Sequence, residues 1–192
     1  MVRLRRHAVM ASAAAFATLM TAAGSAWARP PLPLRMDDAF QQDCLTTHNT
    51  YRARHGAPPL KIDPTLVDYA KNRVNMISQS EGLSHVPPTT GGHGENRHWS
   101  ATTVSGRMAT CKDVVTAWYN DSRDYDYAHP GYSSATGHFT QIVWKETTRV
   151  GCARAAGQGS QWYETYVVCG YLSPGNMGDG DRFKQNVFPP TG

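Results

Sequence analysis

Four cysteines constrain the fold of this chain more than any other feature. Cys44, Cys111, Cys152 and Cys169 are an even number, which in an oxidising compartment favours disulfide bonds. A zinc site of four thiolates is the alternative, but no two of these cysteines have the C-x2-C or C-x4-C spacing that such sites usually use. We therefore expect two disulfides, chosen from the three pairings that four cysteines allow.

The first 28 residues have the pattern of a secretory leader. Three arginines lie in the first six residues, an Ala-rich apolar stretch covers residues 8–23, and Ala26 and Ala28 suit a signal peptidase. A transmembrane anchor is the alternative, but this stretch is shorter than the roughly 20 residues that a helix needs to span a bilayer. We predict a signal peptide over residues 1–28 and a secreted protein, periplasmic or extracellular, with no transmembrane segment after cleavage.

Removal of the leader changes the charge balance. The whole chain carries 19 Lys and Arg against 15 Asp and Glu, a formal charge of +4. Without the three leader arginines, 16 positive and 15 negative side chains remain in 164 residues, a net charge of +1. This near-neutral chain lacks the basic surface of a nucleic-acid-binding protein, so we expect no nucleic-acid partner. Its length suits one domain, and we expect a monomer with a Pro-rich tether at 29–36 and one domain at 37–190.

Hydrophobic periodicity predicts three helices. Apolar residues recur at steps of three and four over residues 36–55, 63–79 and 110–122. The second helix also has a start signal, because Asp63 precedes a proline at the first helical position. Residues 81–100 have no hydrophobic period and contain prolines, glycines and histidines, so we expect a loop there.

Strands are expected in the second half of the chain. Residues 138–144, 151–155 and 162–171 are rich in β-branched, aromatic or alternating apolar side chains. The Tyr- and Gly-rich stretch 124–137 before them is expected to be a loop. Together with the three helices, this order of elements predicts an α+β fold.

A turn between two cysteines predicts a hairpin. Residues 157–160 read Gly-Gln-Gly-Ser, which would fold the strands that carry Cys152 and Cys169 into an antiparallel pair. A bond between these cysteines would contribute about 3 kcal/mol by the chain-entropy model. Cys44 and Cys111 are then paired by elimination only, in a bond between the first and third helices worth about 4 kcal/mol by the same model.

One motif resembles the CAP superfamily, which comprises cysteine-rich secretory proteins, antigen 5 and plant pathogenesis-related 1 proteins. Residues 137–147, GHFTQIVWKET, are similar to the first signature of this family. The resemblance extends from residue 40 to 177. It implies a three-layer α-β-α sandwich with a small antiparallel sheet. The supporting segments are His-Asn-Thr-Tyr-Arg at 48–52, Gly-Glu-Asn at 94–96, Trp-Tyr at 118–119, Cys-Gly-Tyr at 169–171 and Gly-Asn at 175–176.

The resemblance also implies a central cleft. Two metal-binding histidines fall on His85 and His138, and two cleft acids fall on Glu95 and Asp121. Asp121 stands where the family usually has Glu and is one methylene shorter. Two imidazoles could hold Zn²⁺ or another divalent ion weakly, whereas catalytic zinc usually has three protein ligands. We expect no required cofactor.

Besides weak metal binding, two roles of this cleft are open. Glu95 could be a general base on metal-bound water in a hydrolase or protease. The cleft groups could instead only brace the fold by hydrogen bonds. Because no nucleophile accompanies them, we favour a non-enzymatic protein. His48 is expected in a buried polar network, and His93 and His98 are expected to be solvated loop histidines.

A tyrosine-rich loop is the second candidate site. Tyr125, Tyr127 and Tyr132 have spacing similar to the caveolin-binding-like loop that carries sterol binding in fungal members of the family. This resemblance implies a sterol, a fatty acid or another apolar lipid as the ligand. The alternative is that the rings pack on the third helix beside Trp118. An extracellular interaction module that binds a protein or the cell wall is a further alternative.

Overall fold

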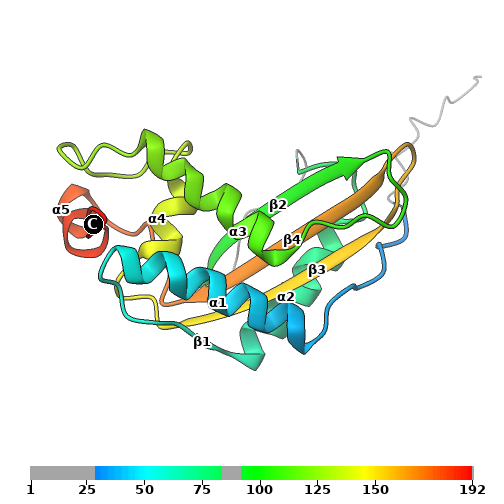
Figure 1. Ribbon diagram of the computed structural model, residues 1–192, viewed down its shortest axis with the longest axis horizontal. Coiled ribbons are helices and arrows are strands. Elements are labelled where there is room, and N and C mark those ends of the chain that lie inside the picture. The colour runs from blue at the N-terminus through cyan, green and yellow to red at the C-terminus, as the bar shows by residue number, and fades with distance from the viewer. Residues whose placement is uncertain (1–28, 84–91, 192) are drawn as a thin grey trace, which may run out of the picture.

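The computed structural model describes residues 29–83 and 92–191. The predicted signal peptide lies outside these residues. Among the described residues, no helix is both long enough and apolar enough to cross a membrane. The described chain forms a sheet that lies between helical layers (Figure 1).

The sheet has four strands in the order β1-β3-β4-β2. Its centre is the predicted hairpin, in which Cys152 lies directly opposite Cys169. β2 pairs antiparallel with β4, and the short β1 pairs parallel with β3. The strands are β1 Lys61–Ile62, β2 Gly94–Thr102, β3 Arg149–Gln158 and β4 Tyr163–Leu172.

The three predicted helices are confirmed as α1, α2 and α3. Asp63 caps α2 as predicted, because its carboxylate accepts a hydrogen bond from the Thr65 N–H at 2.8 Å. A one-turn 3-10 helix, η1, follows α3 directly, and two short helices were not predicted. The helices are α1 Asp38–Arg54, α2 Pro64–Ile77, α3 Cys111–Asn120, η1 Asp121–Asp124, α4 Gly137–Val143 and α5 Gly180–Asn186.

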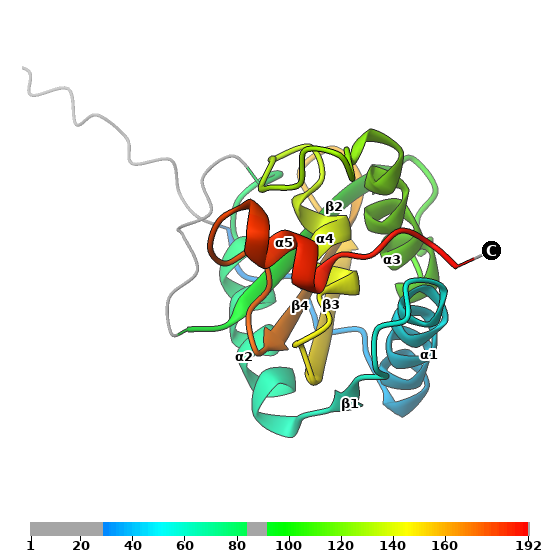
Figure 2. The same ribbon diagram turned by 90° about the vertical axis from the view of Figure 1, so that its left-hand side faces the viewer.

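Alternating side chains of β4 build a core on each face of the sheet. Val167 and Cys169 belong to one core with residues of α1, α3, α4 and α5. Tyr166 and Val168 belong to the other core, under α2. Figure 2 shows α2 on one side of the strands and α1 and α3 on the other. The predicted three-layer α-β-α sandwich is confirmed.

Helix α2 lies very close to the sheet because glycines face it. A Cβ atom at Gly151 would overlap the backbone of Leu66 and Val67, and one at Gly170 would come within 2.8 Å of the Tyr69 ring. These two positions therefore require glycine for packing rather than for a special backbone angle. The close approach also directs Tyr69 of α2 toward the strand β2, which matters for the site below.

Both predicted disulfides are present. Cys152–Cys169 links β3 to β4, and Cys44–Cys111 links α1 to the first residue of α3. The pairing that was reached by elimination is therefore confirmed. All four cysteines are buried.

The prediction of a strand at 138–144 is wrong, because most of these residues form α4. Phe139, Thr140, Ile142 and Val143 are all buried, so the segment has apolar contacts on every side and shows no helical period. The β-branched residues that suggested a strand are tolerated in this short helix. The side chain of Thr140 donates to the Thr136 carbonyl at 3.2 Å, as threonine often does within helices.

The prediction of a loop over 81–100 is also wrong from residue 94 onward. Residues 94–102 form β2, an edge strand whose whole length pairs with β4. Its polar side chains find partners on other elements, such as Arg73 of α2 for Glu95. Because these partners lie far away in the sequence, they cannot be identified from it. The polar side chains also remove the apolar alternation by which a strand is usually recognised.

The predicted tether at 29–36 packs onto the fold instead of standing apart from it. Leu34 bridges Ala155 on the edge of β3, and Leu32 lies in the core under α2. Arg29 forms an ion pair with the buried carboxylate of Glu164. Prolines keep such a segment extended, and the edge of a sheet is where strands tolerate proline. We therefore correct this prediction.

Candidate functional site

A small cleft lies where β2, the loop before α4 and the C-terminal segment meet. Its cavity is about 140 Å³ and includes Asn96, Tyr132, Ser134, His138 and Asn176 among its lining residues. Asn176 holds the wall together, because its amide donates to the Gly137 carbonyl at 2.8 Å and its oxygen accepts from the Thr140 hydroxyl. The lining is mainly polar, with one aromatic ring at its rim.

His138 and Asp121 meet in this cleft as predicted. The His138 Nδ1 lies 3.0 Å from the Asp121 carboxylate, and the ring stacks on Trp118 with centroids 5.9 Å apart. Asp121 can only accept while ionised, so Nδ1 carries the proton and a neutral His138 keeps its lone pair on Nε2. A carboxylate that orients a histidine in this way is typical of metal-binding imidazoles. Asp121 is thus placed to orient His138 rather than to bind an ion itself.

Glu95 also lines this cavity, but its carboxylate points to the opposite face of β2 from the His138–Asp121 pair. Its neighbour Asn96 pairs with Cys169 and faces α1 and α3, so Glu95 faces α2. Its carboxylate accepts from Tyr69 at 2.6 Å and from two Arg73 nitrogens at 2.7 and 2.8 Å, and the side chain is only 2% exposed. The hydrogen bonds to Glu95 raise the pKa of Arg73. Glu95 and His138 therefore line one cavity, while the Glu95 carboxylate is held on the α2 side.

The second predicted histidine, His85, lies outside the described residues. Within residues 29–83 and 92–191, the four cysteines are the one group of three or more His, Cys, Asp or Glu close enough to hold an ion. His98, expected to be a solvated loop histidine, instead lies on β2. Burial and the proximity of His138 both lower the pKa of His98.

A buried network connects the cleft to α1. His48 is fully buried, its Nδ1–H donates to the Cys44 carbonyl at 2.8 Å, and its Nε2 accepts from the Tyr171 hydroxyl at 2.8 Å. The Asn96 amide donates to the Tyr171 oxygen at 3.3 Å and to the His138 carbonyl at 3.1 Å. The predicted role of His48 in a buried polar network is confirmed, and the network fixes the start of α4.

This network predicts a loss of stability in acid. Burial lowers the pKa of His48 to about 4, below its ordinary value of 6.5. The contribution of the neutral His48 ring to the free energy of unfolding is therefore fully present above pH 6.5. It is lost as the pH falls toward 4, and the total loss is about 3 kcal/mol. Urea denaturation between pH 4 and 7 measures this slope.

A His48→Gln variant is the control for the acid slope. It removes the titrating ring, so its stability should fall less steeply over the same pH range even if the variant is less stable throughout. Part of the slope remains in the variant, because burial also lowers the pKa of His55. Equal slopes for the two proteins would contradict the assignment to His48.

The three loop tyrosines have different environments. Tyr125 is buried and packs edge-on against Phe139, with centroids 5.6 Å apart, and Tyr127 packs edge-on against Tyr125 at 4.9 Å. Burial raises the pKa of Tyr127 to about 12. Tyr132 is 65% exposed, and its ring lies over the start of α4, where a Cβ at Gly137 would come within 3.1 Å. Two of the three rings therefore serve the core that contains Phe139 of α4 and Trp118 of α3.

Tyr132 separates the cleft from a second cavity. This cavity is about 170 Å³ and includes Tyr125, Asp126, Ser133 and Thr136 in its lining. Each cavity is smaller than the roughly 300 Å³ at which ligand pockets usually begin. Tyr132 is common to the linings of both cavities.

A third hollow lies between α1 and α2. It is about 350 Å³ and is lined by Gln41, Ile62, Pro64, Val67 and Lys71, with other polar residues at its rim. No motif in the sequence indicated it. It is the alternative place for an apolar ligand and supplies the control in the experiment below.

Comparisons with known proteins identify relatives. The model of the cysteine-rich secretory protein family, CAP, matches residues 45–171. The human Golgi-associated plant pathogenesis-related protein 1 is 36% identical over 153 residues, which cover 79% of this chain and 94% of the human protein. Secreted protein RBT4 of Candida albicans is 37% identical over 161 residues, which cover 82% of this chain but 41% of the fungal protein.

Solved structures show the same fold at lower identity. BmVAL-1 aligns with a TM-score of 0.60 at 16% identity, over 82% of this chain and 85% of that one. A crystal structure of NaASP2 with Zn²⁺ aligns with a TM-score of 0.53 at 22% identity, over 81% of this chain and 88% of that one. These likenesses support the sandwich architecture.

Proposed function

This chain belongs to the CAP family of cysteine-rich secretory proteins, and from this premise we propose that it binds an amphipathic lipid without catalysing a reaction. Relatives named as secreted proteins support the extracellular location expected from the leader. The observation that carries the proposal is the Tyr132 ring, exposed at the junction of two cavities.

The lining on the two sides of Tyr132 favours a ligand with one polar end. Ser134, His138 and Asn176 offer hydrogen-bonding groups in the cleft. A tyrosine ring provides flat apolar contact while its hydroxyl stays in water. A sterol or a fatty acid has this combination of a polar group and an apolar body. The polar end would lie beside His138 and the apolar body against Tyr132.

The position of Glu95 supports binding rather than catalysis. A hydrolase with this cleft needs a general base within reach of the reacting water. Glu95, the acid predicted for that role, lines the cleft, but its carboxylate points toward α2 and already accepts three hydrogen bonds of 2.6 to 2.8 Å. Among the described residues, no serine, threonine or cysteine is hydrogen-bonded to His138 as a nucleophile would be.

The His138 imidazole is also suited to be one ligand of a weakly bound divalent ion. Asp121 holds the Nδ1 proton and leaves Nε2 as the donor atom for the ion. His85 is the proposed second ligand, from the resemblance alone. Such an ion would supply positive charge for the polar end of the lipid. The structural neighbour determined with Zn²⁺ supports zinc as a candidate.

Titration with fluorescent lipids tests the lipid site. Dehydroergosterol and cis-parinaric acid are the probes, and the variant is Tyr132→Ala. Loss of the exposed ring should weaken binding of at least one probe by about tenfold, because burial of an aromatic face contributes about 1.4 kcal/mol or more. The ring is mostly exposed, so the variant should fold normally.

An Ile62→Ser variant is the matched control. Ile62 is also an exposed apolar side chain, 36% exposed, but it lies in the hollow between α1 and α2. Binding should be unchanged in this variant. Weaker binding in Ile62→Ser with normal binding in Tyr132→Ala would move the site to that hollow and contradict our assignment.

A further inference from the structure

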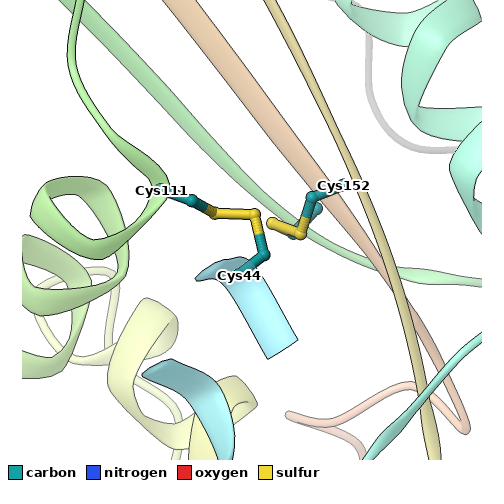
Figure 3. Close-up of side chains that lie close together, drawn as sticks. Cys44, Cys111 and Cys152 are labelled. Carbon is teal, nitrogen blue, oxygen red and sulfur yellow. A yellow bond between two sulfur atoms is a disulfide. The ribbon is translucent and has the colours of Figure 1, made fainter. Parts of the chain in front are cut away.

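The two disulfides lie side by side in the core. The four sulfur atoms of Cys44, Cys111, Cys152 and Cys169 all lie within 4.8 Å of one another. Figure 3 shows the Cys44–Cys111 bond next to the sulfur of Cys152. The four cysteines come from α1, α3, β3 and β4, which explains why no metal-binding spacing is visible in the sequence.

The spread of the sulfurs is close to that of a tetrahedral zinc site. A Zn–S distance of about 2.3 Å places the four sulfurs about 3.8 Å apart. In the reduced protein, the two sulfurs of each former disulfide would move apart. The most distant pair of sulfurs would have to approach by about 1 Å, and small side-chain rotations can supply both movements. Contacts other than the sulfurs hold the backbone in place. β3 and β4 are paired over their whole length, and Phe40 of α1 and Val115 of α3 are packed in the same core.

The position of Cys111 favours a thiolate in this cluster. Cys111 is the first residue of α3, whose ten residues follow the Thr110 cap. The N-terminal end of a helix stabilises negative charge and lowers the pKa of a cysteine placed there. The other three cysteines are buried in apolar surroundings, where a thiolate is stable only with a cation beside it. A thiophilic metal provides that cation.

We propose that the thiol form of this chain binds one Zn²⁺ through Cys44, Cys111, Cys152 and Cys169, and that the metal and the two disulfides are alternative occupants of the same four sulfurs. The thiol form exists before the newly made chain is oxidised. This site is separate from the cleft around His138, and it does not depend on the proposed lipid binding.

Conversion of the zinc-bound form to the disulfide form conserves protons and electrons. When the thiol form binds Zn²⁺, each of the four cysteines releases one proton to solvent. On oxidation the metal leaves and protons return to the sulfurs. Each pair of thiols then transfers two electrons and two protons to an external disulfide, which leaves as a dithiol. Two such oxidant molecules complete the conversion to the two disulfides.

Cobalt spectroscopy of the full mature chain tests the site. The protein is reduced with a phosphine under nitrogen, and Co²⁺ is added as the probe. We expect one equivalent to give the visible and thiolate-to-metal absorption bands of tetrahedral cobalt with four thiolates, which Zn²⁺ then removes. Saturating Zn²⁺ should raise the Tm of the reduced protein by roughly 5 °C or more and should not change that of the oxidised protein.

Variants distinguish this site from the cleft and from an unfolded chain. Cys44→Ser should abolish the four-thiolate spectrum, whereas His138→Gln should leave it unchanged. Near-UV circular dichroism of the cobalt complex should match that of the oxidised protein. Absence of thiolate bands in the reduced protein would overturn the proposal, as would bands that occur only with an unfolded near-UV spectrum. Either failure would leave the lipid proposal untouched.

Discussion

Replacing Arg52 by alanine is expected to lower the free energy of unfolding by about 5 kcal/mol. Arg52 is fully buried, and it pairs with no carboxylate among the described residues. Its guanidinium instead closes the loop after α4 by donating to backbone oxygens. The acceptors are the carbonyls of Pro58 at 2.8 Å, Ile142 and Trp144 at 2.8 Å, Thr147 at 2.9 Å and Lys145 at 3.5 Å.

The size of this effect follows from the burial of those carbonyls. Without Arg52, several carbonyl oxygens inside the core lose their donor, at about 1 to 3 kcal/mol each. Burial lowers the pKa of Arg52 to about 10, so the side chain is still charged at neutral pH. The charge is therefore stabilised by oriented carbonyl dipoles rather than by an opposite charge.

Urea denaturation of two further variants checks this explanation. Arg52→Lys keeps the charge but lacks the planar fork of donors, so it should lose a smaller but still large part of the stability. Arg54→Ala is the matched control on the same helix, since Arg54 is exposed and lies over the Tyr51 ring at 5.0 Å. Its loss should be about 1 kcal/mol or less. A similar loss for Arg52→Ala and Arg54→Ala would contradict the account.

Glu95→Gln is expected to lower the free energy of unfolding by about 4 kcal/mol. The substitution removes the negative charge that faces Arg73, whose side chain is only 9% exposed, and leaves that cation without its main partner. It also replaces the carboxylate that accepts a hydrogen bond from the Tyr69 hydroxyl by an amide, which can present either its oxygen or its NH2 group to Tyr69. Thermal or urea denaturation at pH 7 measures the loss.

A double variant separates a structural role of Glu95 from a catalytic one. Replacing both partners with apolar residues of similar size, as in Arg73→Met with Glu95→Leu, should recover much of the stability, because the two most buried charges are removed together and Arg97, which lies 3.5 Å from Glu95, is 34% exposed to water. If Glu95 were a general base, Glu95→Gln would fold with nearly normal stability and lose a hydrolytic activity. That result would contradict the binding function proposed above.

The parts of the fold that are visible in the sequence are those set by local patterns. Helix α2 has a cap at Asp63, a proline at its first position and a clear apolar face, so its start and its type follow from neighbours along the chain. The β3–β4 hairpin is visible because Gly157 and Gly159 lie at or beside its turn and cysteines lie on both strands, although β3 extends to Gln158 and the turn is residues 159–162 rather than 157–160. The chain-distant bond Cys44–Cys111 followed only once the first pair was assigned.

The parts that the sequence concealed depend on distant partners. Five consecutive residues of helix α4, 139–143, are buried, so no helical period can be read from their sequence. Strand β2 is polar because its side chains pair with distant elements, Glu95 with Arg73 of α2 and Asn96 with Tyr171 of β4, and nothing local marks these pairings. Residues 29–36 look like a tether because prolines disfavour regular structure, yet the edge of β3 accepts them.

The candidate site was visible in part for the same reasons. His138 and Asp121 were assigned from motifs, and the structure brings them within 3.0 Å. Glu95 was assigned with equal support and lines the same cavity, but the side chains of a strand alternate, so its carboxylate points to the other face of β2. Which of the three loop tyrosines is exposed depends on packing against Phe139, and no spacing rule gives that result.

Native mass spectrometry of the protein recovered from the secreting culture tests the central claim most directly. We predict a peak for one chain with one bound lipid, a lipid-free peak for Tyr132→Ala, and retention of the lipid in Ile62→Ser. The lipid is then identified by extraction and fragmentation. A wild-type protein that is lipid-free as isolated and remains lipid-free after incubation with dehydroergosterol and cis-parinaric acid would contradict the account.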